Sequence, residues 1–181
     1  DRIDSRSGRR LGPATGDPRT FTPFDELFDA YRKQLEYIVG LKIEGNSRIE
    51  RLFAEYMPAP FLSIVVEDCI ERGEDYNGAG PRYPATYIQG VGLGTTTDAM
   101  SAIEGHVFSR GTIRMGELVA ALDADFVGHE SARRLLLRQS PRFGNDDERA
   151  DRIARALFDA YFAAIDARPI TKGGRIASTC F

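Results

Sequence analysis

The longest stretch of regular hydrophobic spacing in the 181-residue sequence runs from Thr22 to Tyr56. Its apolar residues recur mostly at steps of three and four, the spacing that places them on one face of an α-helix. They are Phe24, Leu27, Phe28, Tyr31, Leu35, Ile38, Val39, Ile49, Leu52, Phe53 and Tyr56. Thr22 is a favoured N-terminal cap and Pro58 cannot continue a helix, so the pattern predicts a helix between them. Gly40 and Gly45 each cost about 1 kcal/mol relative to alanine inside a helix, and they leave open whether it is unbroken.

The next apolar run predicts a second, deeply buried helix from about Pro60 to Arg72. The letters FLSIVV at 61–66 are apolar on nearly every side of a helix, which is typical of an element surrounded by core. The one polar edge of this helix consists of Glu67, Asp68 and Glu71. Gly73 is a typical C-terminal stop, and residues 74–84 are predicted to form a loop because Asn, Gly and Pro are concentrated there.

Two short strands and four further helices are predicted in the rest of the chain. The strands cover about 85–91 and 175–181, and the helices cover about 95–108, 114–126, 129–139 and 146–166. Residues 1–21 are predicted to be an extended entry segment, because glycine and proline punctuate them without a helical period. Two strands are too few for an independent sheet and amphipathic helices need partners, so we expect the chain to be an excerpt of a longer protein.

The composition excludes some classes of protein and favours a cytoplasmic location. A net charge of −3 gives no electrostatic case for binding nucleic acid or an anionic membrane surface. No apolar run approaches the roughly 20 residues that a membrane-spanning helix needs, and the polar start DRIDSRSGRR is unlike a signal peptide. The two cysteines, Cys69 and Cys180, lie far apart without a CxxC spacing, which favours a reducing compartment.

The residues alone provide no catalytic set. The turn Gly90–Thr95 could present amide groups to a phosphate, but it matches no nucleotide-binding motif and contains no lysine, so a close strand-to-helix turn is the favoured interpretation. His106 and His129 lack a second ligand at metal-binding spacing. Cys69 lies in an apolar helix and is interpreted as a buried, inert thiol, while Cys180 has no base nearby in sequence to activate it.

Four segments, in this order, give the sequence a resemblance to a known family. They are GPATGDPRTFTPFDEL from Gly12, FLSIVVEDCIERGEDYN from Phe61, GVGLGTTTDAMSAI from Gly90 and PRFGNDD from Pro141. Together they resemble the large domain of the glycyl radical enzymes, the pyruvate formate-lyase family. The resemblance implies an α/β fold in which this chain is a helix-rich segment of a ten-stranded barrel built from two antiparallel halves. Residues 1–181 would then form part of a pyruvate formate-lyase-type domain, with 1–21 leading into it and 22–181 supplying helices and two barrel strands.

The resemblance also implies radical chemistry whose main groups lie outside this chain. In such enzymes a radical-SAM activating enzyme installs a radical on a C-terminal glycine, a cysteine receives it as a thiyl, and the thiyl abstracts hydrogen from the substrate. No GCVE-like cysteine motif and no RVxGY-like glycine motif occurs in the 181 residues, so we expect no catalytic residue and no bound cofactor here. Phe181, at the end of the last strand, is the residue expected nearest the substrate pocket, with core packing as the alternative.

The segment YIQGVGLGTTTD at 87–98 is most similar to the eliminating branch of that family, which includes lyases and dehydratases of choline, glycerol, isethionate and hydroxyproline. The implied function is cleavage of a C–O, C–N or C–S bond in a small polar substrate. A pyruvate formate-lyase-like acyltransferase, an arylacetate decarboxylase, a non-catalytic helical scaffold and a phosphate-binding module remain as alternatives. The implied partners are the substrate and the radical-SAM activating enzyme in an anaerobic cell, and a homodimer is left open.

Overall fold

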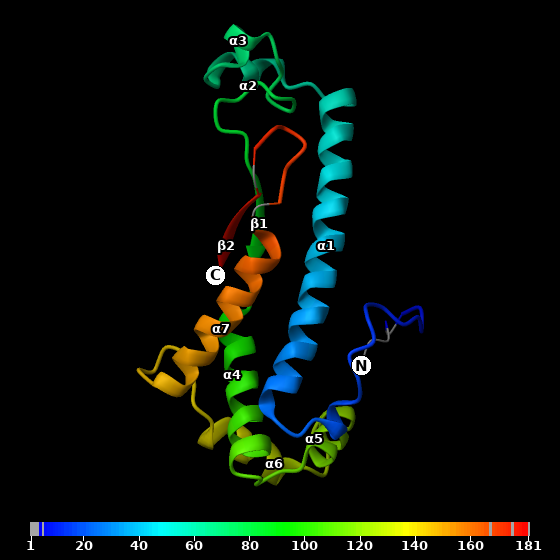
Figure 1. The fold of residues 1–181 in the computed structure, drawn as a ribbon, viewed down its shortest axis with the longest axis vertical. Helices are drawn as coiled ribbons and strands as arrows, with labels where there is room; N and C mark the ends of the chain where they lie inside the picture. Colours follow the sequence, from blue (N-terminus) through cyan, green and yellow to red (C-terminus); the bar gives the residue numbers. More distant parts are fainter. Residues whose placement is uncertain (1–3, 5, 167, 175, 181) are drawn as a thin grey trace. The chain divides into compact units, whose positions relative to one another are not determined.

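The computed structural model describes residue 4 and residues 6–166, 168–174 and 176–180, without the side chains of 178–180 (Figure 1). Within these residues the chain separates into two compact units. The first unit contains the residues up to Leu35 and Val91–Ala160, and the second contains Glu36–Gly90 and Tyr161–Cys180. Two long helices, α1 (Phe24–Tyr56) and α7 (Glu148–Ile165), each contribute residues to both units.

The helix predicted after Thr22 is confirmed as α1, an unbroken helix of 33 residues. Its first turn carries Asp25 and Glu26, whose negative charge complements the positive end of the helix dipole. The Glu26 carboxylate also accepts a hydrogen bond from the Thr22 amide at 3.0 Å. Gly40 and Gly45 do not interrupt the helix, and a Cβ atom at either position would meet open space.

The single helix predicted over 60–72 is wrong, since the segment forms two helices. They are α2 (Pro60–Val65) and α3 (Cys69–Arg72). Asp68 separates them because its backbone adopts φ 72°, a left-handed conformation that a right-handed helix excludes and that few residues other than glycine adopt. Gly73 ends α3 in a left-handed conformation, as the sequence predicts.

The predicted deep burial of this segment is also wrong for its first half. Phe61 is 87% exposed and Val65 is 76% exposed, and α2 contains no buried residue. The predicted burial of Cys69 is confirmed, with 2% of its surface exposed. A continuous apolar run indicates a need for packing partners, and the described part of the chain supplies them to Cys69 but not to α2.

The second unit contains a two-stranded parallel sheet. β1 (Thr86–Gly90) pairs with β2 (Ile176–Cys180), in a register that runs from Thr86 opposite Ile176 to Gly90 opposite Cys180. Both predicted strands are therefore confirmed. β1 is one residue shorter at each end than predicted, and residues 175 and 181 of the second predicted strand lie outside the described residues. Because the strands are parallel, their carboxyl ends lie at the same edge of the sheet, and a long connection containing several helices joins them (Figure 1).

The first unit is built from helices. Besides parts of α1 and α7, its elements are η1 (Pro18–Thr20), α4 (Leu93–Ile103), η2 (Glu104–Ser109), α5 (Met115–Asp123) and α6 (Glu130–Gln139). The helices predicted over this stretch are confirmed, although the one expected over 95–108 continues beyond Ile103 as a π-helix, η2. The helix expected to reach 126 ends at Asp123, because Asp125 and Phe126 both have positive φ.

Buried aliphatic side chains of α5 and α7 form most of the core of the first unit. They are Leu118, Ala121, Ala150, Ile153, Ala154 and Leu157. Outside this core, Arg152 forms an ion pair with Glu104 at 2.6 Å, which links α7 to η2. Within the described ranges, none of the helices combines the length and the apolar character needed to span a membrane.

Candidate functional site

The edge of the sheet where β1 and β2 end is the first candidate site. In open sheets of parallel strands, ligands bind beyond the carboxyl ends of the strands. Gly90 and Cys180 are paired at this edge. Phe181, the predicted substrate-binding residue, follows directly but lies outside the described residues, so its place beside the substrate stays a prediction.

A single carboxylate, that of Glu50 on α1, connects the segments that lead into both strands. It accepts a hydrogen bond from the hydroxyl of Thr86, the first residue of β1. Its second oxygen accepts a hydrogen bond from the hydroxyl of Thr171 at 2.6 Å, in the turn that precedes β2. Glu50 therefore fixes the two strand entries to the same helix, which favours a constant geometry at the opposite, carboxyl edge.

The middle of β1 has a further anchor within the second unit. The hydroxyl of Tyr161, a buried residue of α7, donates to the carbonyl of Ile88 at 2.8 Å. Ile88 is buried and the neighbouring Tyr87 is exposed. This alternation is typical of a strand that has one of its two faces covered.

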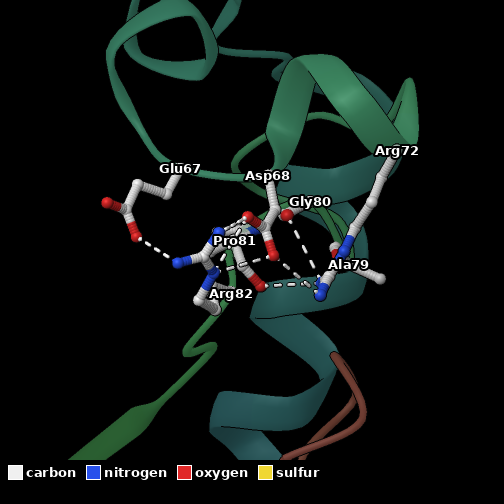
Figure 2. Close-up of polar contacts among 7 residues, drawn as sticks. All are labelled: Glu67, Asp68, Arg72, Ala79, Gly80, Pro81 and Arg82. Atoms are coloured by element: carbon white, nitrogen blue, oxygen red, sulfur yellow. Dashed lines mark hydrogen bonds and ion pairs between the residues drawn. The ribbon is translucent and has the colours of Figure 1, made fainter.

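Asp68 is the centre of a charged cluster that precedes β1, and Figure 2 shows its contacts. The carboxylate, with 12% of its side chain exposed, accepts hydrogen bonds from Arg82 Nε at 2.9 Å and from Arg72 Nη2 at 3.1 Å. Arg82 also forms an ion pair with Glu67 at 3.0 Å. The hydrogen bond from Arg82 is the largest of the effects that lower the pKa of the Asp68 carboxyl, so this group stays ionised and holds both arginines.

Arg72 is the last residue of α3, directly before the loop 73–82, and Arg82 is the last residue of that loop. Because both arginines bind Asp68, their contacts hold the two ends of the loop together. Arg72 Nη1 also donates to the carbonyls of Ala79 at 3.2 Å and Pro81 at 3.0 Å (Figure 2). The chain that enters β1 is therefore fixed by charge-assisted hydrogen bonds, which are stronger than neutral ones.

Inside this loop the packing leaves room for no side chain at Gly80. A Cβ atom there would lie 2.4 Å from the carbonyl oxygen of Glu74 and 2.9 Å from Sγ of Cys69. The buried Cys69 thiol thus fills the interior of the loop, in agreement with its interpretation as an inert thiol.

Asp75 fixes the other side of the loop. Its carboxylate accepts hydrogen bonds from the amides of Asn77 at 2.8 Å and Ala59 at 2.9 Å, and from the hydroxyl of Ser63 at 2.8 Å. These donors, with the Asn77 amide first, lower the pKa of the Asp75 carboxyl. Lys172 Nζ lies 5.5 Å from the centre of the adjacent Tyr76 ring, so the loop also contacts the turn that precedes β2.

His106 is completely buried in η2 of the first unit. Its Nε2 lies 3.0 Å from Nη2 of Arg110, which can only donate, so Nε2 accepts and the ring proton is on Nδ1. Nδ1 lies 2.9 Å from the Thr112 hydroxyl, which in turn donates to the carbonyl of His106. Burial, followed by the charge of Arg110, lowers the pKa of the imidazole, so the structure supports a neutral, structural histidine.

The other residues singled out in the sequence have structural positions. His129 is the residue that precedes α6. Gly92 has φ 91° and precedes α4, where its carbonyl accepts hydrogen bonds from the amide and hydroxyl of Thr96 at 2.9 Å each. This backbone conformation favours glycine at position 92. Within the described residues, the His, Cys, Asp and Glu side chains form no group of three that could hold a metal ion.

Sequence reasoning missed the residues that carry most of these contacts. It placed Asp68 on the edge of a helix and did not single out Glu50, whose hydrogen-bond partners are distant in the sequence. The sequence contained one indication of the Asp68 cluster, since Arg72 and Arg82 stand on either side of a loop that contains Asn, Gly and Pro.

Comparison with known proteins places this geometry in a family. A family model described as pyruvate formate lyase-like matches residues 1–181. Trans-4-hydroxy-L-proline dehydratase of Clostridioides difficile is 46% identical over 171 residues, which cover 94% of this chain and 22% of that protein.

Solved structures give the same result. The crystal structure of hydroxyproline dehydratase from Clostridioides difficile, with trans-4-hydroxy-L-proline bound, matches with a TM-score of 0.95 and 44% identity over 99% of this chain and 23% of that chain. The glycerol-bound B12-independent glycerol dehydratase of Clostridium butyricum matches with a TM-score of 0.89 and 31% identity, covering 97% of this chain and 22% of that chain.

These matches identify the class of protein. The relatives are glycyl radical enzymes, and the described fold is a helix-rich segment of their α/β barrel. The chain belongs to the pyruvate formate lyase-like family. The resemblance that rests on the four sequence segments is therefore confirmed. The chain spans about a fifth of the length of the relatives that it matches.

Proposed function

We propose that this chain is a segment of a larger glycyl radical enzyme, called here the parent protein, which acts as a dehydratase or lyase. The observation that carries the proposal is the 46% identity to trans-4-hydroxy-L-proline dehydratase over 94% of the chain. Identity at that level across nearly every helix and strand supports a shared barrel. The second relative described above, which acts on glycerol, is also a dehydratase.

The proposed reaction is cleavage of a C–O, C–N or C–S bond in a small polar substrate, with loss of water from a hydroxylated compound as the leading case. A glycine radical and a cysteine thiyl, on loops outside these 181 residues, would supply the hydrogen abstraction. The proposed partners are the substrate and a radical-SAM activating enzyme in an anaerobic cytoplasm. A homodimer is the assembly to test first.

The residues of this chain would position the pocket rather than react. Glu50 holds the entries of both strands, and the Asp68 cluster holds the loop before β1. Phe181 follows β2 in the sequence, and we propose that its ring forms part of the pocket wall. An apolar ring there excludes water from the carbon skeleton of the substrate, while a few polar groups elsewhere provide recognition. Residues 1–181 would form part of a pyruvate formate-lyase-type domain, with 1–21 as its entry segment.

The test of the reaction uses the parent protein, purified without oxygen and activated by its radical-SAM enzyme. Electron paramagnetic resonance measures the glycyl radical, and product analysis follows incubation with trans-4-hydroxy-L-proline, glycerol or isethionate. We expect a glycyl radical signal and dehydration of at least one hydroxylated substrate. Formation of acetyl-CoA and formate from pyruvate and coenzyme A, or decarboxylation of an arylacetate, would assign another branch. Failure to form any radical after activation would refute the enzyme proposal.

The place of Phe181 is tested separately by Phe181→Leu in the activated parent protein. Loss of ring contact with the substrate is expected to raise KM while the yield of glycyl radical stays the same. An unchanged KM together with a lower thermal midpoint would contradict the pocket assignment and support core packing instead.

A further inference from the structure

α6 presents a group of exposed arginines. Arg133, Arg134 and Arg138 lie on the helix and Arg142 follows it, and all four are exposed. An open hollow of about 310 Å³ is lined by Ser131, Arg134, Leu135, Arg138 and Gln139, and these five residues are called the α6 surface. Arg134 and Arg138 are four residues apart, so their side chains lie on the same side of the helix.

Within the part of the chain that the structure describes, the arginines of α6 form no ion pair with a carboxylate, whereas many other arginines do. Among the described residues nine arginines form ion pairs with Asp or Glu, and none of the nine lies on α6. They are Arg19, Arg32, Arg48, Arg72, Arg82, Arg114, Arg149, Arg152 and Arg155.

Glu130, the one acidic residue of α6, does not neutralise the helix. Its carboxylate accepts a hydrogen bond from the Gly128 amide at 3.0 Å. Backbone amide groups are the largest effects that lower the pKa of this carboxyl, and Arg134 is a smaller one. The guanidinium groups of the α6 surface therefore keep their capacity to donate hydrogen bonds to an anion.

The local charge contrasts with that of the chain. The segment 130–142 contains four arginines and one glutamate, whereas the chain as a whole carries a net charge of −3. A confined positive area on an acidic protein attracts negatively charged groups and accelerates their association. Because the remaining surface is acidic on balance, a long polyanion such as nucleic acid is disfavoured.

The composition of the α6 surface favours contact with a separate protein over packing inside the parent protein. Surfaces buried within one chain are mainly apolar, and arginine is almost never fully buried unless it is paired. Interfaces between separate proteins instead combine arginine with scattered apolar residues. Leu137 and Phe143, each 46% exposed, supply such apolar residues beside the arginines.

The size of the α6 surface favours a peptide segment over a small anion. From Ser131 to Gln139 the helix rises about 12 Å, which is more than one carboxylate or phosphate group spans. The hollow is also open, whereas pockets for small molecules enclose most of the ligand surface.

We propose that the α6 surface is a docking site for an acidic segment of a separate protein. Two carboxylates of that segment bind Arg134 and Arg138, the Ser131 hydroxyl and Gln139 amide supply further hydrogen bonds, and Leu135 contacts the intervening carbon atoms. This interaction is independent of the radical reaction, so it can be measured on the parent protein without activation.

The probe for the experiment is a fluorescein-labelled hexaglutamate peptide, and its binding to the parent protein is measured by fluorescence anisotropy. The double variant Arg134→Glu/Arg138→Glu is expected to raise Kd at least tenfold. The control is Arg9→Glu/Arg10→Glu, which changes the net charge equally at two exposed arginines outside α6. We expect the control to change Kd less than twofold. Raising the salt concentration should weaken binding to the wild type, since the contacts are ionic.

Three outcomes would overturn the proposal. The first is equal loss of binding in the variant and the control, which would show that only total charge matters. The second is protection of Arg134 and Arg138 from phenylglyoxal in the parent protein alone, measured by peptide mass spectrometry, because its own chain would then cover them. The third is variant-sensitive binding of a labelled DNA duplex, or of inorganic phosphate by calorimetry, without binding of hexaglutamate.

Discussion

Gly80 offers a sharp test of the loop that precedes β1, because one added methyl group at this position meets backbone atoms. The change is Gly80→Ala in the parent protein. The new Cβ would lie 2.4 Å from the Glu74 carbonyl oxygen and 2.8 Å from that of Asp75. An ordinary carbon–oxygen contact is about 3.3 Å, so the backbone of the loop must move by about 1 Å.

The loop has little freedom to make that movement. Arg72 and Arg82 are both bound to Asp68 at its ends, and the Cys69 sulfur would be only 2.9 Å from the new methyl group. Overpacking of this kind costs about 1–3 kcal/mol. Since every 1.4 kcal/mol is a factor of ten, local opening of residues 73–82 is expected to become about 5- to 150-fold more frequent.

Hydrogen–deuterium exchange of peptides that cover residues 73–82 measures this opening directly. The control is Gly45→Ala, at a helical position with open space around the Cβ, where alanine should slow exchange by stabilising α1 by about 1 kcal/mol. If Gly80→Ala left exchange of 73–82 unchanged while the control slowed exchange in α1, the close packing of this loop would be disproved.

Three further predictions concern the Asp68 cluster, the buried histidine and the core. The pKa of Asp68 is lowered in the folded protein, so its contribution to stability is present above the ordinary value of 3.8 and is lost as the pH falls through the lower folded value. The protection factors of residues 73–82, which are corrected for the intrinsic pH dependence of amide exchange, should therefore fall in acid. In Asp68→Asn that fall should be smaller, with the contribution of Asp75 remaining. The pKa of His106 is also lowered, so the stability of the first unit should decline as the pH falls from 6.5 through the lower folded value. His106→Gln should flatten that decline when the protection factors of η2, corrected for intrinsic exchange, are followed against pH. Leu157→Ala, at a side chain that is 1% exposed, should cost about 2–5 kcal/mol and lower the denaturation midpoint, whereas the same change at Leu122, which is 55% exposed, should have little effect.

Hydrophobic period was sufficient to predict α1, α5, α6 and α7, because apolar residues that recur at helical spacing are local information in the sequence. The same signal failed for 60–72. FLSIVV predicts burial, but the conformation of Asp68 depends on Arg82, fourteen residues later, and no local pattern contains that contact. The π-helical turn η2 was missed for a similar reason, since its buried His106 depends on Thr112 and Arg110 beyond it.

The candidate site was less predictable than the fold. Alternation and turn residues predict that β1 and β2 exist, but they do not predict that the two strands pair in parallel. Glu50 shows why. Its partners Thr86 and Thr171 lie 36 and 121 residues away in the sequence, and a glutamate on a long helix would ordinarily be interpreted as a solvent-exposed residue. The assignment of the family came instead from short segments whose order and spacing are specific, although each is weak alone.

The parallel pairing of β1 and β2 also constrains the time course of folding. About 90 positions separate each residue of β1 from its partner in β2, so β1 leaves the ribosome well before the strand that completes it. At 5–20 residues per second, this interval is about 5 to 20 s. During that time Tyr87 and the unpaired edge of β1 are available to other nascent chains, and the helices between the strands must fold before the sheet can close. Until residue 180 has been synthesised, β1 is thus a strand whose edge β2 cannot yet cover.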